Sequence, residues 1–185
     1  PIVDGVFSYD RNQTKLINTD FYYEVSNSPT FNTDPFNPLI RLPFYLCALE
    51  KYMQYCLSLA SRGSGFVAPN PMVGALVVAE GRIIGEGWHQ EFGAAHAEVN
   101  ALNTVKPENV HLLSESTLFV TLEPCNHFGK TPPCTEKIIN SGIKKVVVGT
   151  LDPNPLVSGK GIARLKENGI EVIVGLLEKD CRELN

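Results

Sequence analysis

Residues 73–87, VGALVVAEGRIIGEG, decide the fold class because they carry the first clear strand pattern of the chain. Two apolar runs, 73–79 and 82–87, flank Glu80-Gly81, which is typical of a tight turn between antiparallel strands. Downstream the patterns alternate between helix and strand, with helices expected over 95–105, 132–140, 161–168 and 176–184 and strands over 117–122, 144–148 and 171–174. This alternation predicts an α/β fold, a mixed, mostly parallel sheet of about five strands with helices on both faces.

Upstream of the hairpin, the character of the chain changes at about residue 44. Apolar residues at helical spacing predict a helix from Leu46 to Ala60. Residues 1–43 hold five prolines and five asparagines, with a strand pattern at 21–25 and irregular loop expected over 28–43. The sequence therefore predicts an N-terminal extension of unknown role over residues 1–43 and one domain over residues 44–185.

The composition excludes several classes of protein. The 185 residues, 43% hydrophobic and 19% charged, are typical of a globular domain with a short addition. A net charge of −4 without a basic stripe indicates that nucleic acid is not a partner. No apolar run approaches the roughly 20 residues needed to span a membrane. The first residues lack a secretory signal, so we expect a cytoplasmic protein with no membrane partner.

The five cysteines are an odd number spread along the chain, which is a poor basis for a disulfide framework. Cys47 and Cys56 fall at expected core positions of the first helix. His96, Cys125 and Cys134 each fall at the boundary of an expected helix or strand, and one imidazole with two thiolates suits Zn²⁺. Three protein ligands leave the fourth tetrahedral position to water, as in catalytic zinc sites.

Glu98 is the candidate catalytic group. Residues two apart on a helix do not share a face, so Glu98 need not ligate the metal beside His96. Zinc lowers the pKa of a bound water towards about 7, and a neighbouring carboxylate can accept that proton and return it to a leaving amine. We therefore expect one Zn²⁺ per chain with a bound water or hydroxide. The alternative is a structural zinc with His127 or Cys181 as a fourth ligand.

These motifs resemble the zinc-dependent cytidine-deaminase superfamily, whose signature is H-x-E followed by P-C-x-x-C. The chain has His96-Ala97-Glu98 and Pro124-Cys125, but eight residues rather than two separate its cysteines. The segment TLEPCNHFGKTPPC, residues 121–134, is similar to one branch in particular, the deaminase domain of the riboflavin-biosynthesis deaminase/reductases. The similarity covers about residues 51–185 and includes APNPMVG at 68–74, GWH at 87–89, DPNP at 152–155 and GKG at 159–161.

The resemblance implies a three-layer α-β-α cytidine-deaminase-like fold and a zinc-dependent hydrolase. The expected reaction converts 2,5-diamino-6-(5-phosphoribosylamino)pyrimidin-4-one to the 5-amino-uracil product with release of ammonia. In this family His96, Cys125 and Cys134 match the zinc ligands, and Glu98 matches the proton shuttle. The positions that the family uses around base, ribose and phosphate match Asn70, His89, His127, Lys130, Thr131, Asp152 and Asn154.

The chemistry of these residues agrees with such a substrate. Lys130, Thr131 and His127 supply a cation and hydrogen-bond donors for a phosphate. Asp152 and Asn154 follow the carboxyl end of an expected strand, where α/β sheets bind ligands. Taken alone, Lys130 is equally a solvated loop cation, and Asp152 and Asn154 are equally turn residues before prolines.

The resemblance also implies a homo-oligomer, dimer or tetramer, and a reductase domain that is separate or missing. No Gly-rich dinucleotide motif occurs in these 185 residues. Two alternatives stay open: a deaminase of another nucleoside, nucleotide or tRNA base, and a catalytically silent deaminase-like binding module.

Overall fold

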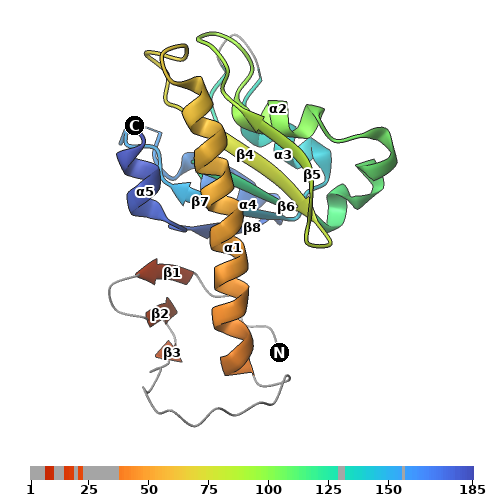
Figure 1. Cartoon of the computed structure of the whole chain (residues 1–185), viewed down its shortest axis with the longest axis vertical. Helices are drawn as coiled ribbons and strands as arrows, with labels where there is room; N and C mark the ends of the chain where they lie inside the picture. The colour runs from red at the N-terminus through yellow and green to blue at the C-terminus, as the bar shows by residue number, and fades with distance from the viewer. Residues whose placement is uncertain (1–6, 11–14, 19–20, 23–37, 129–131, 156) are drawn as a thin grey trace.

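A computed structural model describes residues 7–10, 15–18, 21–22, 38–128, 132–155 and 157–185, with side chains from Leu46 onward. Its centre is a five-stranded sheet in the order β5-β4-β6-β7-β8 (Figure 1). The strands are β4 (Gly74–Ala79), β5 (Arg82–Trp88), β6 (Thr117–Leu122), β7 (Lys145–Thr150) and β8 (Glu171–Val174). The hairpin expected from residues 73–87 is thus β4 and β5.

Four of the five strands run in one direction. β4 pairs antiparallel with both β5 and β6, whereas β6, β7 and β8 pair parallel, so only β4 opposes the others. In the β4–β5 turn, Glu80 has φ 51° and Gly81 has φ 73°. Positive φ at both central residues is the type I′ geometry that matches the twist of the flanking strands. The mixed, mostly parallel sheet predicted from the sequence is confirmed.

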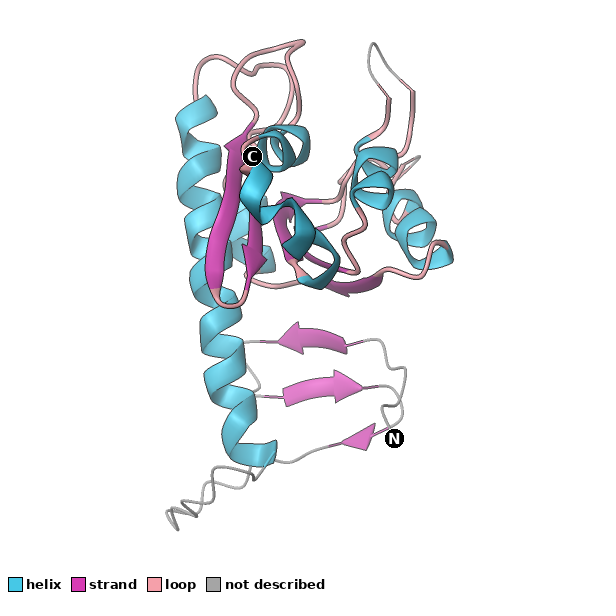
Figure 2. Cartoon of the chain, turned by 90° about the vertical axis from the view of Figure 1, so that its right-hand side faces the viewer, coloured by secondary structure: helices cyan, strands magenta, loops and turns pink. Residues whose placement is uncertain are grey.

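Helices cover both faces of this sheet, as the strand side chains alternate between two apolar cores. Ala75 and Val77 belong to one core, and Leu76 and Val78 to the other. The first core is closed by α2 (Ala97–Asn103), α3 (Cys134–Ser141) and α4 (Lys160–Glu167), and the second by α1 (Pro38–Ala60) and α5 (Glu178–Glu183). Figure 2 shows the helices on either side of the sheet. The three-layer α-β-α prediction is confirmed.

The N-terminal region differs from expectation. Helix α1 begins at Pro38, so the loop expected over 28–43 is wrong for residues 38–43, and residues 28–37 lie outside the described part. Proline is favourable at the first helical position, and the helix tolerates Pro43 although its missing N–H costs one hydrogen bond. Helix α1 runs across the boundary expected between residues 43 and 44, so the secondary structure has no break at that point. The division into an extension and a domain stays a prediction.

A second, antiparallel sheet precedes α1. It contains β1 (Phe7–Asp10), β2 (Lys15–Asn18) and β3 (Phe21–Tyr22), in that order. The strand expected over residues 21–25 is confirmed for Phe21–Tyr22, and residues 23–25 lie outside the described part. The sequence pattern did not indicate β1 or β2.

The two cysteines of α1 have different surroundings. Cys56 is completely buried in the second core, as expected, but Cys47 is exposed, so its assignment to the core is wrong. Nine residues correspond to two and a half helical turns, which places the two side chains on opposite sides of α1.

The connections between these elements contain two 3₁₀ helices, η1 (Ser61–Gly63) and η2 (Pro107–Glu115).

The sequence predicts no membrane-spanning segment, and the lengths and compositions of the helices bear on this prediction. Across the described ranges, we find no helix with the length and apolar character that a bilayer crossing requires.

Candidate metal centre and catalytic cavity

One edge of the sheet collects most of the residues singled out in the sequence. β5, β6 and β7 run in the same direction, and their carboxyl ends are followed by His89, Cys125 and Asp152 respectively. β4 runs the opposite way, so Asn70, which precedes it, comes to the same edge. The order and directions of the strands therefore bring together four segments that are far apart in the sequence.

Three metal-ligating side chains meet at this edge. The Nδ1 atom of His96 lies 3.3 Å from the Sγ of Cys134 and 3.6 Å from the Sγ of Cys125. The three donor atoms all lie within 4.8 Å of one another. His96 therefore presents Nδ1, not Nε2, to the two sulfurs.

The donor set fits zinc in both chemistry and spacing. Ligand distances of about 2.0 Å for nitrogen and 2.3 Å for sulfur in a tetrahedron place a nitrogen and a sulfur donor about 3.5 Å apart. The two separations from His96 Nδ1, 3.3 and 3.6 Å, lie on either side of that value. Two sulfurs and one imidazole also match the ligand preference of zinc over magnesium or calcium.

Element ends fix the three donors. His96 is the N-cap residue of α2, Cys125 follows β6, and Cys134 is the first residue of α3, as the sequence predicted. The backbone N–H of Cys134 donates to the Sγ of Cys125 over 3.3 Å, and that of Thr135 donates to the Cys125 carbonyl over 3.2 Å. The start of α3 therefore holds both cysteines in a fixed relation.

The proton balance of the two thiols favours a thiolate. The hydrogen bond from the Cys134 thiol lowers the pKa of Cys125 to about 4, with further lowering by His96. The same hydrogen bond and burial raise the pKa of Cys134 above its usual range. Hydrogen bonding to Cys125 also raises the pKa of His96. A metal ion requires deprotonated thiols, and this cluster already favours one thiolate.

Glu98 lies beside the donors but outside their group. Its side chain is 3% exposed, and burial is the main cause that raises the pKa of its carboxyl to about 7. It lines the same cavity as His96 and Cys125. A buried carboxyl with a pKa near neutrality suits proton transfer in both directions.

The cavity over the cluster has a volume of about 350 Å³. Its lining residues come from the loops at the sheet edge and from the start of α2. Those that the sequence had singled out are Asn70, His89, His96, Glu98, Cys125, His127 and Asp152. Among the other lining residues, Phe92 is a large exposed aromatic side chain. The cavity is therefore polar around the cluster and apolar at Phe92.

Asn70 and His89 form one hydrogen-bonded unit. His89 is 2% exposed, and its Nδ1 lies 3.2 Å from the Ala95 carbonyl oxygen, which can only accept. A neutral His89 therefore carries its proton on Nδ1 and accepts from the Asn70 Nδ2 through Nε2, over 3.2 Å. This arrangement leaves the Oδ1 of Asn70 as an acceptor for a ligand.

One of the expected substrate residues does not line the cavity, and two others lie outside the described part of the chain. Lys130 and Thr131 lie outside the described residues. Asn154 is exposed and does not line the cavity, although its backbone N–H donates to Asp152 Oδ1 over 2.8 Å. The two residues thus share a turn in which only Asp152 borders the cavity.

Neither candidate fourth ligand joins the donor group within the described part of the chain. Cys181 is buried in the core under α5, on the other face of the sheet. His127 lines the cavity but does not belong to the group of three donors. Within the described residues the donor group therefore has three members, of which His96 and Cys125 line the cavity.

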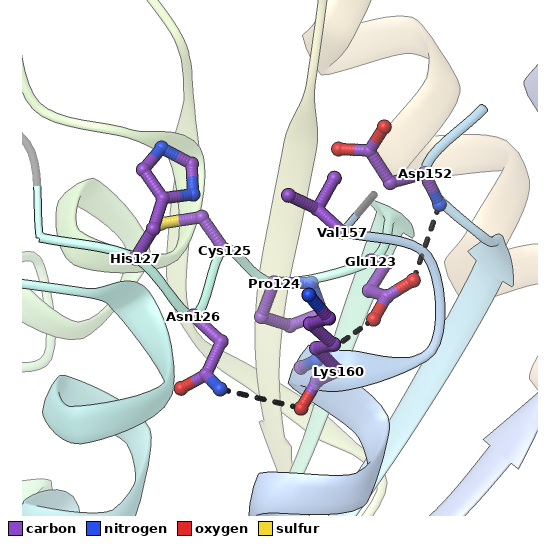
Figure 3. A pocket seen from close by; sticks show the side chains of 9 residues that line it. Glu123, Pro124, Cys125, Asn126, His127, Asp152, Val157 and Lys160 are labelled. Atoms are coloured by element: carbon purple, nitrogen blue, oxygen red, sulfur yellow. Dashed lines mark hydrogen bonds between the residues drawn. The ribbon is translucent and has the colours of Figure 1, made fainter. Parts of the chain in front are cut away.

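Glu123 did not stand out in the sequence. This carboxylate is 6% exposed, and its Oε1 accepts from the backbone N–H groups of Gly161 and Ile162 over 2.8 and 3.3 Å. Its Oε2 accepts from that of Asp152 over 3.2 Å (Figure 3) and from that of Gly159 over 2.9 Å. Glu123 therefore fixes the loop after β7 and the start of α4. The only available signal was its place in the segment TLEPC.

The three-layer fold, the His-Cys-Cys cluster and the buried carboxylate beside it are together typical of zinc-binding deaminase domains. The family model described as "Cytidine and deoxycytidylate deaminase zinc-binding region" matches residues 47–150, more than half of the chain. The chain belongs to this family, within the branch of the diaminohydroxyphosphoribosylamino-pyrimidine deaminases.

The branch follows from individual relatives. A riboflavin biosynthesis protein RibD of Aquifex aeolicus is 56% identical over 136 residues, 74% of this chain and 37% of the relative. A diaminohydroxyphosphoribosylamino-pyrimidine deaminase of Buchnera aphidicola is 48% identical over 72% of this chain and 88% of its own length. The structure of a deaminase/reductase of Thermotoga maritima has a TM-score of 0.71 and 51% identity, over 76% of this chain and 40% of that one. The chain thus spans only about two fifths of the RibD-type relatives.

Proposed function

We propose that this chain hydrolyses 2,5-diamino-6-(5-phosphoribosylamino)pyrimidin-4-one to the 5-amino-uracil product and ammonia, as a step of riboflavin biosynthesis. The observation that carries the proposal is the meeting of His96, Cys125 and Cys134 beside the buried carboxyl of Glu98 in one cavity. The names of the similar RibD and deaminase proteins support the choice of substrate.

One zinc ion per chain is part of the proposal, held by His96 Nδ1 and the sulfurs of Cys125 and Cys134. Bound there, zinc would supply Lewis acidity and lower the pKa of a water molecule towards about 7. The proposal is supported by His96 and Cys125 lining the cavity, where a fourth, non-protein ligand would have room.

Glu98 would move the proton. Its carboxylate accepts a proton from the attacking water as oxygen bonds to the ring carbon, and returns it to the amine as the carbon–nitrogen bond breaks. Ammonia leaves, and the ring carbon keeps the oxygen, so atoms and charge balance. The position of Glu98 against the cysteine cluster and away from bulk water supports this role.

Recognition of the ring and ribose would fall to the other polar side chains of the cavity. The free Oδ1 of Asn70, with His89 fixing its orientation, can accept from a ring amine. Asp152 can accept from ribose hydroxyls, with Asn154 in the same turn. His127, Lys130 and Thr131 are proposed for the phosphate side.

An ammonia-release assay tests the function against its alternatives. Wild-type protein, with its zinc content measured by elemental analysis, is incubated with the phosphoribosylated pyrimidine, with cytidine and with a tRNA anticodon stem-loop. Ammonia from the first substrate alone is the expected result. Release from either of the others would reassign the substrate, and no release with no bound zinc would support a catalytically silent module.

Three further proposals concern the setting of the enzyme. Homo-oligomerisation, as a dimer or tetramer, is to be tested by light scattering. The reductase step would need a separate protein or a region beyond these residues. The proposed compartment is the cytoplasm. All five cysteines are free thiols, and a pair of metal-ligating thiols is typical of a reducing compartment.

A further inference from the structure

A second cavity adjoins the one over the metal cluster. It has a volume of about 180 Å³ and shares Glu123, Cys125, His127 and Asp152 with the larger cavity. Lys160, the first residue of α4, lines the smaller cavity and not the larger one. A ligand that reaches from the cluster past Asp152 would therefore arrive at Lys160.

The smaller cavity is bordered by the Lys160 ammonium group together with the acidic residues Glu123 and Asp152. Figure 3 shows Lys160 beside Pro124 at the start of α4, among the residues that line this cavity together with His127 and Asp152. Lys160 is exposed, and within the described ranges none of the ion pairs engages its ammonium group. The nearby Glu123 carboxylate is already used by four backbone N–H groups.

The backbone of Lys160 is held firmly in place. Its carbonyl oxygen accepts from the Nδ2 of Asn126 over 3.4 Å, and the N–H groups of Gly159 and Gly161 on either side both donate to Glu123. A Cβ at Gly161 would collide with the Pro124 carbonyl oxygen, so α4 approaches this loop closely. Only the side chain of Lys160 needs to be ordered when a ligand binds.

We propose that Lys160 forms the anion subsite for the phosphate end of the substrate, with His127 as a neighbouring donor. The inference rests on the proposed function. With the ring at the cluster and the ribose at Asp152, the phosphate of a phosphoribosyl group continues into the smaller cavity. The N–H groups at the start of α4 face Glu123, so the lysine ammonium supplies the charge there.

The test compares Lys160→Gln with Lys166→Gln, an exposed lysine on the same helix, using the phosphorylated pyrimidine and its dephosphorylated nucleoside. For Lys160→Gln we expect the KM of the phosphorylated substrate to rise about ten- to a hundredfold, which is typical of losing a hydrogen bond to a charged group. The kcat, the kinetics with the nucleoside, the zinc content and the unfolding midpoint should match wild type. Lys166→Gln should change none of these values.

Two kinetic outcomes overturn the proposal: an unchanged KM for the phosphorylated substrate, or an equal loss with both substrates. If the wild type deaminates neither substrate, the proposed function fails, and calorimetric titration with ribose 5-phosphate and ribose then decides about the subsite. Binding of ribose 5-phosphate but not ribose, weakened at least about tenfold by Lys160→Gln, would support it. No binding, or no effect of the substitution, would overturn it.

Discussion

The chemistry of Glu98 depends on where α2 begins. His96 is the N-cap residue of this helix, and Glu98 is its second residue, so the backbone directs the two side chains differently. His96 reaches the cysteine sulfurs, while Glu98 lies buried beside them with a pKa raised to about 7. Two positions along the chain thus separate the residues proposed for metal binding and for proton transfer.

Glu98→Gln keeps the shape of the side chain but removes its capacity to exchange a proton. We expect ammonia release to fall about 10²- to 10⁴-fold, the range typical of a lost general acid–base group, with unchanged zinc content. Steady-state kinetics and elemental analysis measure the two quantities. Glu91→Gln, an exposed change in the loop before α2, is the control and should keep wild-type turnover. Turnover by Glu98→Gln at the wild-type rate would exclude the proton-transfer role.

Cys134→Ser tests the metal cluster itself. A serine hydroxyl is a much poorer ligand for zinc than a thiolate, so purified protein should contain little zinc and release no ammonia. Cys47→Ser is the matched control because Cys47 is an exposed thiol on α1 that does not belong to the donor group. The zinc content of Cys47→Ser should equal that of wild type. A full zinc complement in Cys134→Ser would contradict the proposed ligand set.

For single residues, the sequence indicated those whose side-chain chemistry is distinctive. It did not indicate Glu123, whose role depends on which backbone groups surround it. His96, Cys125 and Cys134 stood out because few roles require one imidazole and two thiols at element boundaries. Glu123 did not stand out, because a single glutamate is usually a solvated side chain. Only the folded chain shows that four backbone N–H groups converge on it.

Among the elements, the loop after β7 and the start of α4 depend on one carboxylate. Glu123 lies after β6, yet its four donors belong to residues 152–162, after β7. Hydrogen bonds to Glu123 thereby connect the segment after β6 to the segment after β7, next to the cavity. The position of Asp152, and of Lys160 at the start of α4, depends on this connection.

Glu123→Ala should lower the free energy of unfolding by about 2–4 kcal/mol, because buried backbone donors lose their acceptor. Urea-induced unfolding measures the change. Glu136→Gln provides the comparison. It removes a partly exposed ion pair with Arg164 between α3 and α4, so its effect should stay below about 1 kcal/mol. Equal losses of unfolding free energy in the two variants would contradict the prediction that the four hydrogen bonds of Glu123 stabilise the fold more than the surface ion pair does.

For the whole molecule, the apolar core under α1 and α5 lies on the opposite face of the sheet from α2 and α3, whose N-terminal ends carry donors of the metal cluster. The core under α1 and α5 contains Met53, Phe119 and Cys181 but none of the metal-donor side chains. The donor cluster lies at the sheet edge, where α2 and α3 begin. A change in the core under α1 should therefore alter stability without altering the site.

Met53→Ala should cost about 2–5 kcal/mol of unfolding free energy, because this side chain is fully buried and its removal leaves a cavity. Below the unfolding transition, its KM, kcat and zinc content should match wild type. Gln54→Ala, the exposed neighbour on α1, should stay within about 0.5 kcal/mol of wild type. Loss of zinc from folded Met53→Ala would show that the two faces are coupled.

The sequence by itself determined the fold class, the β4–β5 turn and the side chains able to bind zinc, because these features follow from local periodicity, backbone preferences and ligand chemistry. It placed α1 too late and Cys47 in the core, because where a helix starts and which of its faces is buried depend on what packs against it. The tertiary structure alone decided that Asn70, His89, Cys125 and Asp152 share one edge, since strand order and direction are set by contacts between distant segments. The same long-range contacts brought Glu123 to its donors and Lys160 to the second cavity.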